Sequence, residues 1–421
     1  MSSMVLPYEL WYDILLGATF IPREFEVSTT TFRPGLASGS DEHYMREYRK
    51  ILPTRVAIIK VCRVWHRIGT EFLYGSVQFI SWSNTVGTLW GHLALFKMLL
   101  ESQPEIGTLV KRLSLPYDPT DQAAADVLRM CPRITIFSTS STRASCSWWA
   151  PTLFQPVLRQ LDIMIDSKSW LKFVSVLNSL IYLEVLYMHV EGLFPTFPTF
   201  PTFPSNATSI SLPALRLLEL SFQSIYGIAL SGFAARFDVP RLRALSLSSG
   251  SPPVPQLLLP SQLQTITSLK VYDIYDLHAG DLQNLTQVYM TLHSSTVLPH
   301  LSACVPFHRL EWLGLNLREC PWYSRDWTSR CERLLAFPLD PSAMPKLRVL
   351  GINWGARRIV DWDSTATNRS DFAAFFQPMI TIFEQRGVEL IEPQLDLLHN
   401  PMSMQSIVDS FRGKGRRRLF R

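Results

Sequence analysis

One short pattern recurs through most of the chain, and it constrains the fold more than any other feature. An apolar residue is followed by further apolar residues three and five positions later, as in Leu158-Arg-Gln-Leu161-Asp-Ile163. The pattern starts at residues 110, 134, 158, 183, 215, 242, 269, 285, 310 and 347. Most intervals are 24 to 27 residues, and the exceptions are 32, 16 and 37. A repeat of this length predicts a solenoid of stacked units that share one core.

The end of each repeat alternates apolar and polar residues, which is typical of a short strand with one buried face. Residues 121–130 and 167–180, in gaps between repeats, carry apolar residues at helical spacing. The repeat length is that of leucine-rich repeats. We therefore predict an α/β fold in which residues 81–400 form a right-handed leucine-rich-repeat solenoid, a curved parallel sheet with outer helices. The 16-residue interval is too short for a strand and a helix, so one of its two starts is misplaced or the connection is a bare loop.

Residues 1–80 carry two amphipathic segments that precede the repeats. In the first, Pro7 stands where a helix can begin, and Leu10 and Ile14 lie one turn apart. A second helix is predicted over residues 54–73, from apolar residues spaced three or four apart at Ile58, Val61, Trp65, Ile68 and Phe72. Two short helices are not stable alone, so they need a partner surface, either the solenoid or another protein.

These two segments resemble a known motif. The opening Leu6-Pro-Tyr-Glu-Leu10-Trp-Tyr-Asp-Ile14-Leu15 and the later Val61-Cys-Arg-Val-Trp65 resemble the F-box, which docks substrate receptors onto the Skp adaptor of cullin–RING ubiquitin ligases. The following Ile68-Gly-Thr-Glu-Phe-Leu-Tyr74 is similar to the segment after this motif in fungal F-box-like proteins. An F-box followed by leucine-rich repeats is a familiar domain order in that family. The resemblance implies a short helical F-box-like domain over residues 1–80.

The resemblance also implies two groups of adaptor-binding residues. The first group is Leu6, Pro7, Leu10, Ile14 and Leu15. The second group, which forms the rest of the contact or its supporting core, is Val61, Cys62 and Trp65. Apolar and aromatic anchors near the centre of such a surface carry most of its binding energy.

The sequence departs from the family pattern by an insertion over residues 17–52, between the two blocks of the motif. The insertion is rich in Ser, Thr, Gly and charged residues. Lengthening a surface loop costs only about 0.6 kcal/mol per doubling of its length. We therefore expect the insertion to loop out, with an added helix at residues 43–50. It either leaves the adaptor-binding face open or covers it.

The strand-lined concave side of a solenoid is the expected site for a target protein. The residues predicted to face it lie between the repeat apolars and are Asp162, Tyr187, Glu219, Asp273, Tyr289 and Trp312. Acids mixed with large aromatics suit a protein partner better than a phosphate backbone. A register shift of one residue would move these side chains to the other face of the sheet.

The charge distribution argues against a nucleic-acid partner. The chain has a net charge of +5, but residues 412–421 hold five Arg and one Lys, so removing these six charges leaves −1 for residues 1–411. A nucleic-acid-binding domain would carry its basic excess on the folded body. No apolar stretch is long enough for a membrane helix, and no secretory signal is expected. The six scattered Cys are typical of reduced thiols in a cytoplasmic or nuclear protein.

No feature predicts catalysis. Nucleotide-binding, dinucleotide-binding, serine-hydrolase and zinc-protease motifs do not occur in the sequence, and the nine His show no ligand spacing with Cys. We expect no catalytic residue, no cofactor and no metal. The Pro-Thr-Phe triplets over residues 194–204 are interpreted as an expanded surface loop, and the alternative is a docking peptide with a row of phenylalanines. The basic residues 412–421 are interpreted as a solvated terminus, and the alternative is a nuclear-import or acidic-partner signal.

Two hypotheses of function follow. In the first, the protein is a non-catalytic substrate receptor of a Skp–cullin–F-box ubiquitin ligase, whose helices bind the adaptor while the repeats hold an unidentified target protein. In the second, it is a leucine-rich-repeat scaffold for binding proteins, without a link to ubiquitin, and the N-terminal helices only cap the repeats. A third, weaker hypothesis is a nucleic-acid binder that depends on the basic tail.

Overall fold

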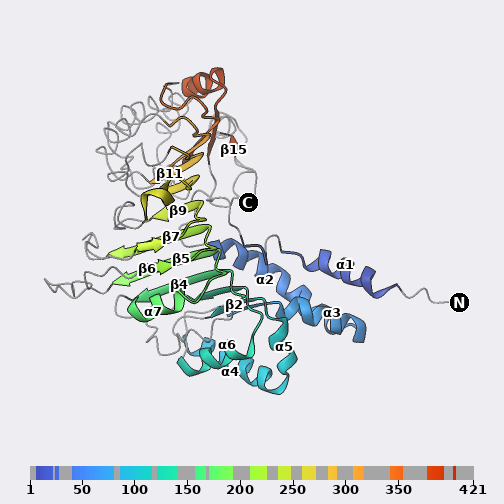
Figure 1. Ribbon diagram of the computed structural model, residues 1–421. Coiled ribbons are helices and arrows are strands. Elements are labelled where there is room, and N and C mark those ends of the chain that lie inside the picture. The colour runs from blue at the N-terminus through green and yellow to red at the C-terminus, as the bar shows by residue number, and fades with distance from the viewer. Residues whose placement is uncertain are drawn as a thin grey trace. The chain divides into compact units, whose positions relative to one another are not determined.

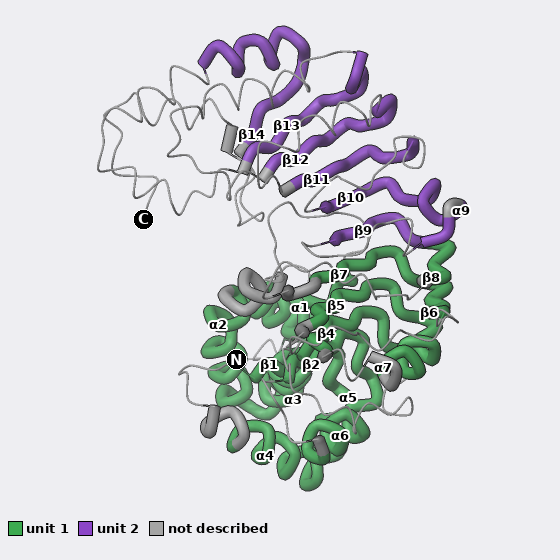
Figure 2. The backbone as a smooth tube through the Cα atoms, turned by 90° about the vertical axis from the view of Figure 1, so that its left-hand side faces the viewer, with its two compact units in different colours: residues 1–29, 37–241 green, residues 30–36, 242–421 purple. Residues whose placement is uncertain are grey.

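The computed structural model describes residues 6–21, 24–27, 40–79, 86–115, 121–139, 157–166, 170–192, 209–224, 236–247, 258–271, 283–291, 307–316, 342–353, 377–392 and 402–403. The Pro-Thr-Phe segment, Asp273 and the basic tail, on which predictions were made, lie outside these residues. The chain divides into two compact units (Figure 2). Unit 1 comprises Met1–Thr29 and Ala37–Arg241, and unit 2 comprises Thr30–Leu36 and Leu242–Arg421. This division falls inside the predicted repeat array.

Unit 1 begins with helices and continues with alternating strands and helices (Figure 1). Its helices are α1 (Tyr8–Thr19), α2 (Ser40–Ile58), α3 (Arg63–Tyr74), α4 (Val86–Ser102), α5 (Pro104–Leu109), α6 (Asp121–Met130) and α7 (Trp170–Leu177). Its strands are β1 (Ser76–Gln78), β2 (Arg112–Leu115), β3 (Ile136–Thr139), β4 (Gln160–Asp166), β5 (Val185–Gly192), β6 (Ser209–Ser211), β7 (Leu217–Ser224) and β8 (Arg236–Asp238). The predicted helices near residues 121–130 and 167–180 are confirmed as α6 and α7.

The main sheet of unit 1 is parallel and has the order β1-β2-β3-β4-β5-β7. Equivalent positions of the repeat stand side by side, so that Phe137, Leu161, Leu186 and Leu218 form one buried row across four strands. The short strands β6 and β8 form a separate parallel pair. The stacking of these apolar rows explains why one repeat could not bury its own apolar face and why several together can.

Unit 2 consists mainly of further parallel strands. Its elements are β9 (Ala244–Leu247), α9 (Pro260–Leu263), β10 (Ser268–Val271), β11 (Gln287–Thr291), β12 (Trp312–Asn316), β13 (Val349–Asn353), β14 (Glu389–Glu392) and β15 (Met402–Ser403). Strands β9 to β14 pair in parallel in this order, and β15 adds to β14 in the antiparallel sense. Together the two units give the predicted α/β class with parallel strands.

The turns into β2 to β5, β7 and β10 to β13 use one repeated backbone arrangement. Two successive N–H groups donate to the same carbonyl of the preceding repeat. In unit 1, the N–H groups of Arg159 and Gln160 both donate to the Thr135 carbonyl oxygen, at 2.9 and 3.0 Å. In unit 2, those of Glu311 and Trp312 both donate to the Thr286 carbonyl oxygen, at 2.9 and 3.0 Å. The same local geometry therefore recurs at equivalent positions of the sequence repeat.

The strand register corrects one predicted repeat. Leu269 pairs with Leu245 and with Val288, which are the second apolar residues of their repeats. The repeat therefore starts at Ile266, three residues before the predicted start at 269, and Ile266 is fully buried. Lys270, rather than Asp273, occupies the polar position between the last two apolar residues. The start at 269 was wrong because Ile266 and Leu269 are each followed by an apolar residue three positions later, so either of them could begin a repeat.

The last described strand of the parallel series, β14, follows a helix. Residues 377–385 are helical and include Pro378. Gly387 has φ of 72°, in the left-handed region that glycine tolerates without steric cost. The N–H of Val388 donates to the Phe383 carbonyl oxygen at 2.8 Å, which closes the helix end before β14 begins.

Gly314, in β12, leaves room for two stacked rings. The rings of Tyr289 and Trp312 are stacked at a centroid distance of 6.3 Å. A Cβ at position 314 would lie 2.3 Å from Tyr289 Cδ2 and 2.3 Å from Trp312 Cη2. Because such distances are not tolerated, any larger residue here must displace at least one ring.

We expect Gly314→Ala to destabilise unit 2 by about 1–3 kcal/mol, the usual cost of overpacking a core. The matched control is Gly91→Ala in α4, where a new Cβ would meet nothing within 4 Å. Since alanine favours a helix over glycine, this control should stabilise the chain slightly, by up to about 1 kcal/mol. Urea unfolding followed by circular dichroism measures both changes. Equal effects of the two substitutions would contradict the packing described here.

Candidate protein-binding surfaces

Helices α1, α2 and α3 enclose a small apolar core of their own. Leu15 of α1, Ile58 of α2, and Ile68 and Phe72 of α3 are buried together. Trp11 of α1 packs on this core and meets the ring of Trp65 edge to face, at a centroid distance of 5.1 Å. The helices form the arm at the right of Figure 1.

The predicted second helix is in fact two helices. Helix α2 ends at Ile58 and α3 begins at Arg63, so residues 54–73 are not one continuous rod. The N–H of Val61 donates to the Ile58 carbonyl oxygen at 3.2 Å, a turn that ends the helical course. Cys62 has extended backbone geometry and caps α3. Val61 and Cys62 therefore lie in the turn between the helices.

The insertion between the two motif blocks does not simply loop out. Its second half is helical from Ser40 and continues through Pro53 as α2, so the predicted helix at residues 43–50 is longer than expected. Tyr48 is buried with Ile21, and its hydroxyl donates to the Ser76 carbonyl oxygen at 3.2 Å. Burial raises the pKa of Tyr48 to about 12. The insertion thus joins the helices to the first strand of the sheet.

A buried ion pair holds this junction. The Arg55 guanidinium donates to both carboxylate oxygens of Glu24, at 2.8 and 2.6 Å, and also to the Thr19 carbonyl oxygen at 3.0 Å. The two side chains are only 3% and 6% exposed. Arg112 of β2 donates to the Glu24 main-chain carbonyl at 3.3 Å. A bidentate pair of this kind fixes the segment after α1 against both α2 and the sheet.

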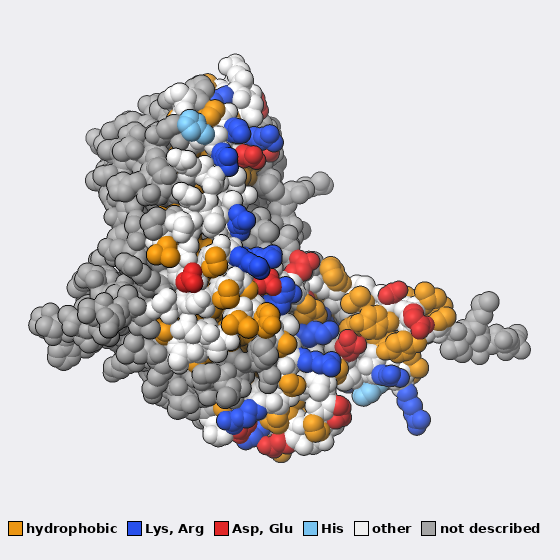
Figure 3. Space-filling model, in the orientation of Figure 1, with side chains coloured by type: hydrophobic (Ala, Val, Ile, Leu, Met, Phe, Trp, Pro, Cys, Tyr) orange, Lys and Arg blue, Asp and Glu red, His pale blue; other side chains and the backbone are white. Residues whose placement is uncertain are grey.

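A set of large apolar side chains of the helical arm stays exposed. Tyr8, Leu16 and Phe20 are among them. Those that belong to the predicted adaptor contact are Leu6, Leu10 and Ile14 at α1 and Val61 in the turn, and we add Val64, which follows Val61 in α3. We call these five residues the N-terminal apolar set. Leu10 is 47%, Ile14 51% and Val61 59% exposed. Figure 3 shows hydrophobic side chains gathered on the visible face of the arm.

The predicted adaptor-binding residues thus separate into two kinds. Pro7 and Cys62 are exposed along with four members of the N-terminal apolar set. Leu15 is 3% exposed and belongs to the core, so it supports the helices and presents no surface. Trp65 is half-buried against Trp11, which agrees with the supporting-core alternative for that residue.

The two described free thiols differ in exposure. Cys131 is buried, and burial raises its pKa to about 12, so almost none of it is thiolate at neutral pH. Cys62 is exposed at the start of α3. We expect iodoacetamide to modify Cys62 in the native chain and to reach Cys131 only after unfolding in urea. Peptide mass spectrometry measures both, and equal labelling of the two native thiols would contradict the structure.

The residues predicted to face a target fall into separate places. In unit 1, Asp162, Tyr187 and Glu219 are neighbours on adjacent strands and are half-buried. The Asp162 carboxylate also lies 3.8 Å from Nε2 of His189. These three residues are therefore neighbours in one row of the sheet.

The rest of the row differs from the prediction. In unit 2, Tyr289 is 1% exposed and stacks on Trp312, so its ring belongs to the core. Trp312 pairs with Gln287, and Tyr289 pairs with Gly314. Trp312 therefore stands two residues earlier in its repeat than Tyr289 does. Sequence spacing alone had assigned both aromatics to the same row. Asp273 lies outside the described residues.

No family model matches this sequence, and no curated protein is significantly similar to it. Within the described residues, no group of His, Cys, Asp and Glu side chains has the arrangement of a metal site. None of the described helices combines the length and the apolar character needed to cross a membrane. Interpretation of function therefore depends on the surfaces themselves.

Proposed function

We propose that the protein is a non-catalytic substrate receptor of a Skp–cullin–F-box ubiquitin ligase. In this proposal the helical arm docks onto the Skp-type adaptor, and the strand units, which we infer to be a leucine-rich-repeat solenoid, hold a target protein. Support for the solenoid comes from the repeated turn geometry and from the buried apolar rows of both units. The receptor contributes proximity to ubiquitin transfer and performs no chemistry itself.

The observation that carries the proposal is the exposure of the N-terminal apolar set. Leu10, Ile14 and Val61 occupy positions that resemble the adaptor-binding positions of the F-box, and each is more than two fifths exposed. Leu15, adjacent to Ile14, is buried, so the exposure is not a consequence of an unfolded helix. An isolated chain that leaves several large apolar side chains open on one short arm has a surface suited to a partner.

The scaffold hypothesis also has an observation in its favour. The helical arm is attached to the start of the sheet through Tyr48, Arg55 and Arg112, as a cap would be. A cap needs no exposed apolar residues, however, because its apolar face is already covered by the sheet. The receptor proposal accounts for both the attachment and the exposed set.

A pull-down with the full chain tests the proposal. We expect the Skp-type adaptor and a cullin to co-purify with it, and we expect a Leu10→Asp variant that keeps its thermal unfolding transition to lose both. Trp65→Ala should weaken both the fold and the binding, since Trp65 supports α1. Recovery of the folded chain without adaptor or cullin would favour the scaffold.

A further inference from the structure

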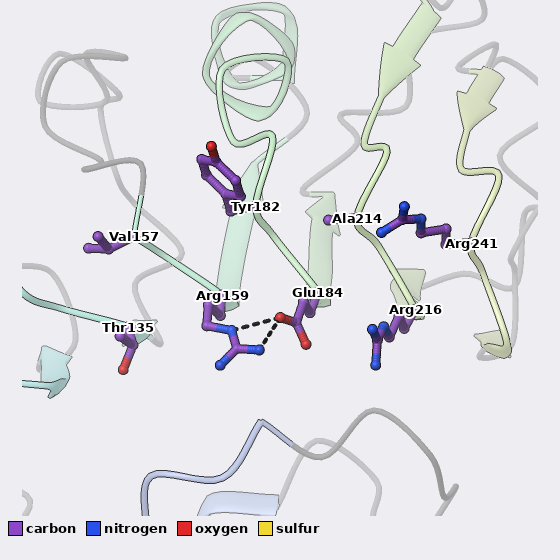
Figure 4. A pocket seen from close by; sticks show the side chains of 8 residues that line it. All are labelled: Thr135, Val157, Arg159, Tyr182, Glu184, Ala214, Arg216 and Arg241. Carbon is purple, nitrogen blue, oxygen red and sulfur yellow. Dashed lines mark hydrogen bonds and ion pairs between the residues drawn. The ribbon is translucent and has the colours of Figure 1, made fainter.

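A groove in unit 1 has the chemistry of a binding site for an acidic peptide. It lies where the chain enters the parallel strands and has a volume of about 560 Å³ (Figure 4). That volume is within the range of about 300–1,000 Å³ that is typical of ligand sites. Residues of consecutive repeats form its walls, and the strand register brings these residues together.

One row of the groove is charged. Thr135, Arg159, Glu184 and Arg216 each directly precede a strand, from β3 to β7, and therefore stand side by side about 4.8 Å apart. Arg159 Nε donates to Glu184 Oε1 at 2.7 Å, and its Nη2 contacts the same oxygen. This pair neutralises Glu184 and leaves the next residue, Arg216, as surplus positive charge.

The second row lies two residues earlier in each repeat. It consists of Val157, Tyr182, Ala214 and Arg241 (Figure 4). Val157 and Tyr182 are 43% and 56% exposed and offer apolar contact area. Ala214 is the small member between Tyr182 and Arg241, and its short methyl side chain leaves space between them. In Figure 4 the Arg241 side chain points back toward Ala214.

Two arginines of the groove have no acidic partner within the part of the chain that the structure describes. Among the residues that the structure describes, Arg216 and Arg241 make no ion pair and no side-chain hydrogen bond, and both are exposed. The groove therefore carries a net charge of two positive units after the Arg159–Glu184 pair is set aside. Guanidinium groups bind carboxylates by paired hydrogen bonds, which gives direction as well as attraction. Figure 3 shows basic side chains beside hydrophobic ones on the strand-bearing surface.

We propose that this groove binds an acidic segment of a partner protein, with carboxylates on Arg216 and Arg241 and an apolar side chain against Val157 and Tyr182. The near-neutral charge of residues 1–411 means that the attraction is local to the groove. As a place to hold a ubiquitination target, the groove rests on the proposed function. The binding of an acidic peptide itself does not, because it requires no adaptor.

Fluorescence anisotropy with the full chain tests the proposal. The probe is a fluorescein-labelled glutamate-rich peptide with one central leucine, and the matched probe has glutamine in place of glutamate. We expect the acidic probe to bind and the glutamine probe to bind at least about tenfold more weakly, since two charge-assisted pairs are lost. Binding should weaken as salt is raised.

Three variants make the test specific. Arg216→Glu with Arg241→Glu should reduce the affinity for the acidic probe at least about tenfold. Ala214→Trp, which fills the groove without changing its charge, should do the same while the thermal transition is retained. Lys346→Glu, at an exposed residue outside the groove lining, should leave the affinity within about twofold, because it changes no side chain that lines the groove.

Three results would overturn the proposal. The first is unchanged binding in the double arginine variant. The second is loss of binding when the chain is truncated after Phe411, because the basic tail would then be the site. The third is equal or tighter binding of a single-stranded oligonucleotide that competes for the groove. If the acidic probe does not bind but the adaptor still co-purifies, only the groove proposal is contradicted. If the probe binds but the adaptor does not co-purify, only the receptor proposal is contradicted.

Discussion

Glu24→Gln is expected to destabilise the junction between the helical arm and the sheet by about 3–5 kcal/mol. The substitution keeps the shape of the side chain but removes the negative charge that faces the Arg55 guanidinium, which is 3% exposed. Removing one partner of a buried pair costs more than the pair contributes, because the remaining charge stays desolvated. Hydrogen exchange of peptides covering residues 40–58, measured against urea, gives the free energy of this local unfolding.

The same helix offers a matched control. Lys50 and Glu47 form an ion pair at the same distance of 2.6 Å, but their side chains are 61% and 29% exposed. Lys50→Gln should therefore cost no more than about 0.5 kcal/mol, as exposed pairs do. Glu24→Leu combined with Arg55→Met should recover most of the loss, since it removes both charges of the pair. Similar effects of Glu24→Gln and Lys50→Gln would show that the Arg55 pair is not buried.

Ile14→Asp is expected to weaken adaptor binding by about 2–4 kcal/mol, roughly 30-fold or more, without unfolding the chain. Ile14 is 51% exposed, so a carboxylate there remains solvated in the free protein. In the complex the carboxylate would be buried against an apolar partner, and that desolvation opposes binding. Isothermal titration of the full chain with the Skp-type adaptor measures the change.

Two neighbouring substitutions separate binding from folding. Leu15→Asp places a charge in the core formed with Ile58 and Ile68, so it should unfold the arm as well as abolish binding. Ile382→Asp changes an exposed apolar residue, 42% exposed, on the helix of unit 2 and should affect neither property. Normal adaptor affinity in a folded Ile14→Asp variant would exclude the N-terminal apolar set from the contact.

The strands were largely predictable because their signal is local and repeated. Each start such as Leu158 or Leu215 is followed by a strand two residues later, and the buried positions match the apolar positions of the pattern. The start near residue 269 failed because its apolar residues permit two registers. Pairing with β9 and β11, which the sequence of this repeat does not contain, selects Ile266.

The helical arm was less predictable, since two features of its sequence suggest helix boundaries that differ from the observed ones. The apolar spacing of Ile58, Val61 and Trp65 continues through the turn between α2 and α3, so it imitates one helix. Pro53, which usually marks a helix start, lies inside α2. The burial of Arg55 has no sequence signal, because its partner Glu24 is 31 residues away.

The two candidate surfaces also differ in how well the sequence predicts them. Exposure of Leu10 and Ile14 on one face of α1 could be predicted from a spacing of four residues and from the F-box resemblance. The groove could not, because Thr135, Arg159 and Arg216 become neighbours only through the strand register. Aligning the repeats in the sequence would have placed these three residues in one row. It would not have shown which of them form ion pairs, because that depends on side-chain geometry.

The central claim is that the N-terminal apolar set is the surface at which the adaptor binds. Hydrogen–deuterium exchange of the full chain, with and without saturating Skp-type adaptor, tests it most directly. We predict slower exchange on binding in peptides that cover residues 8–19 and 59–67, and unchanged exchange in peptides that cover residues 157–192. Absence of a complex, or protection confined to the strands while the helical arm exchanges as before, would contradict the claim.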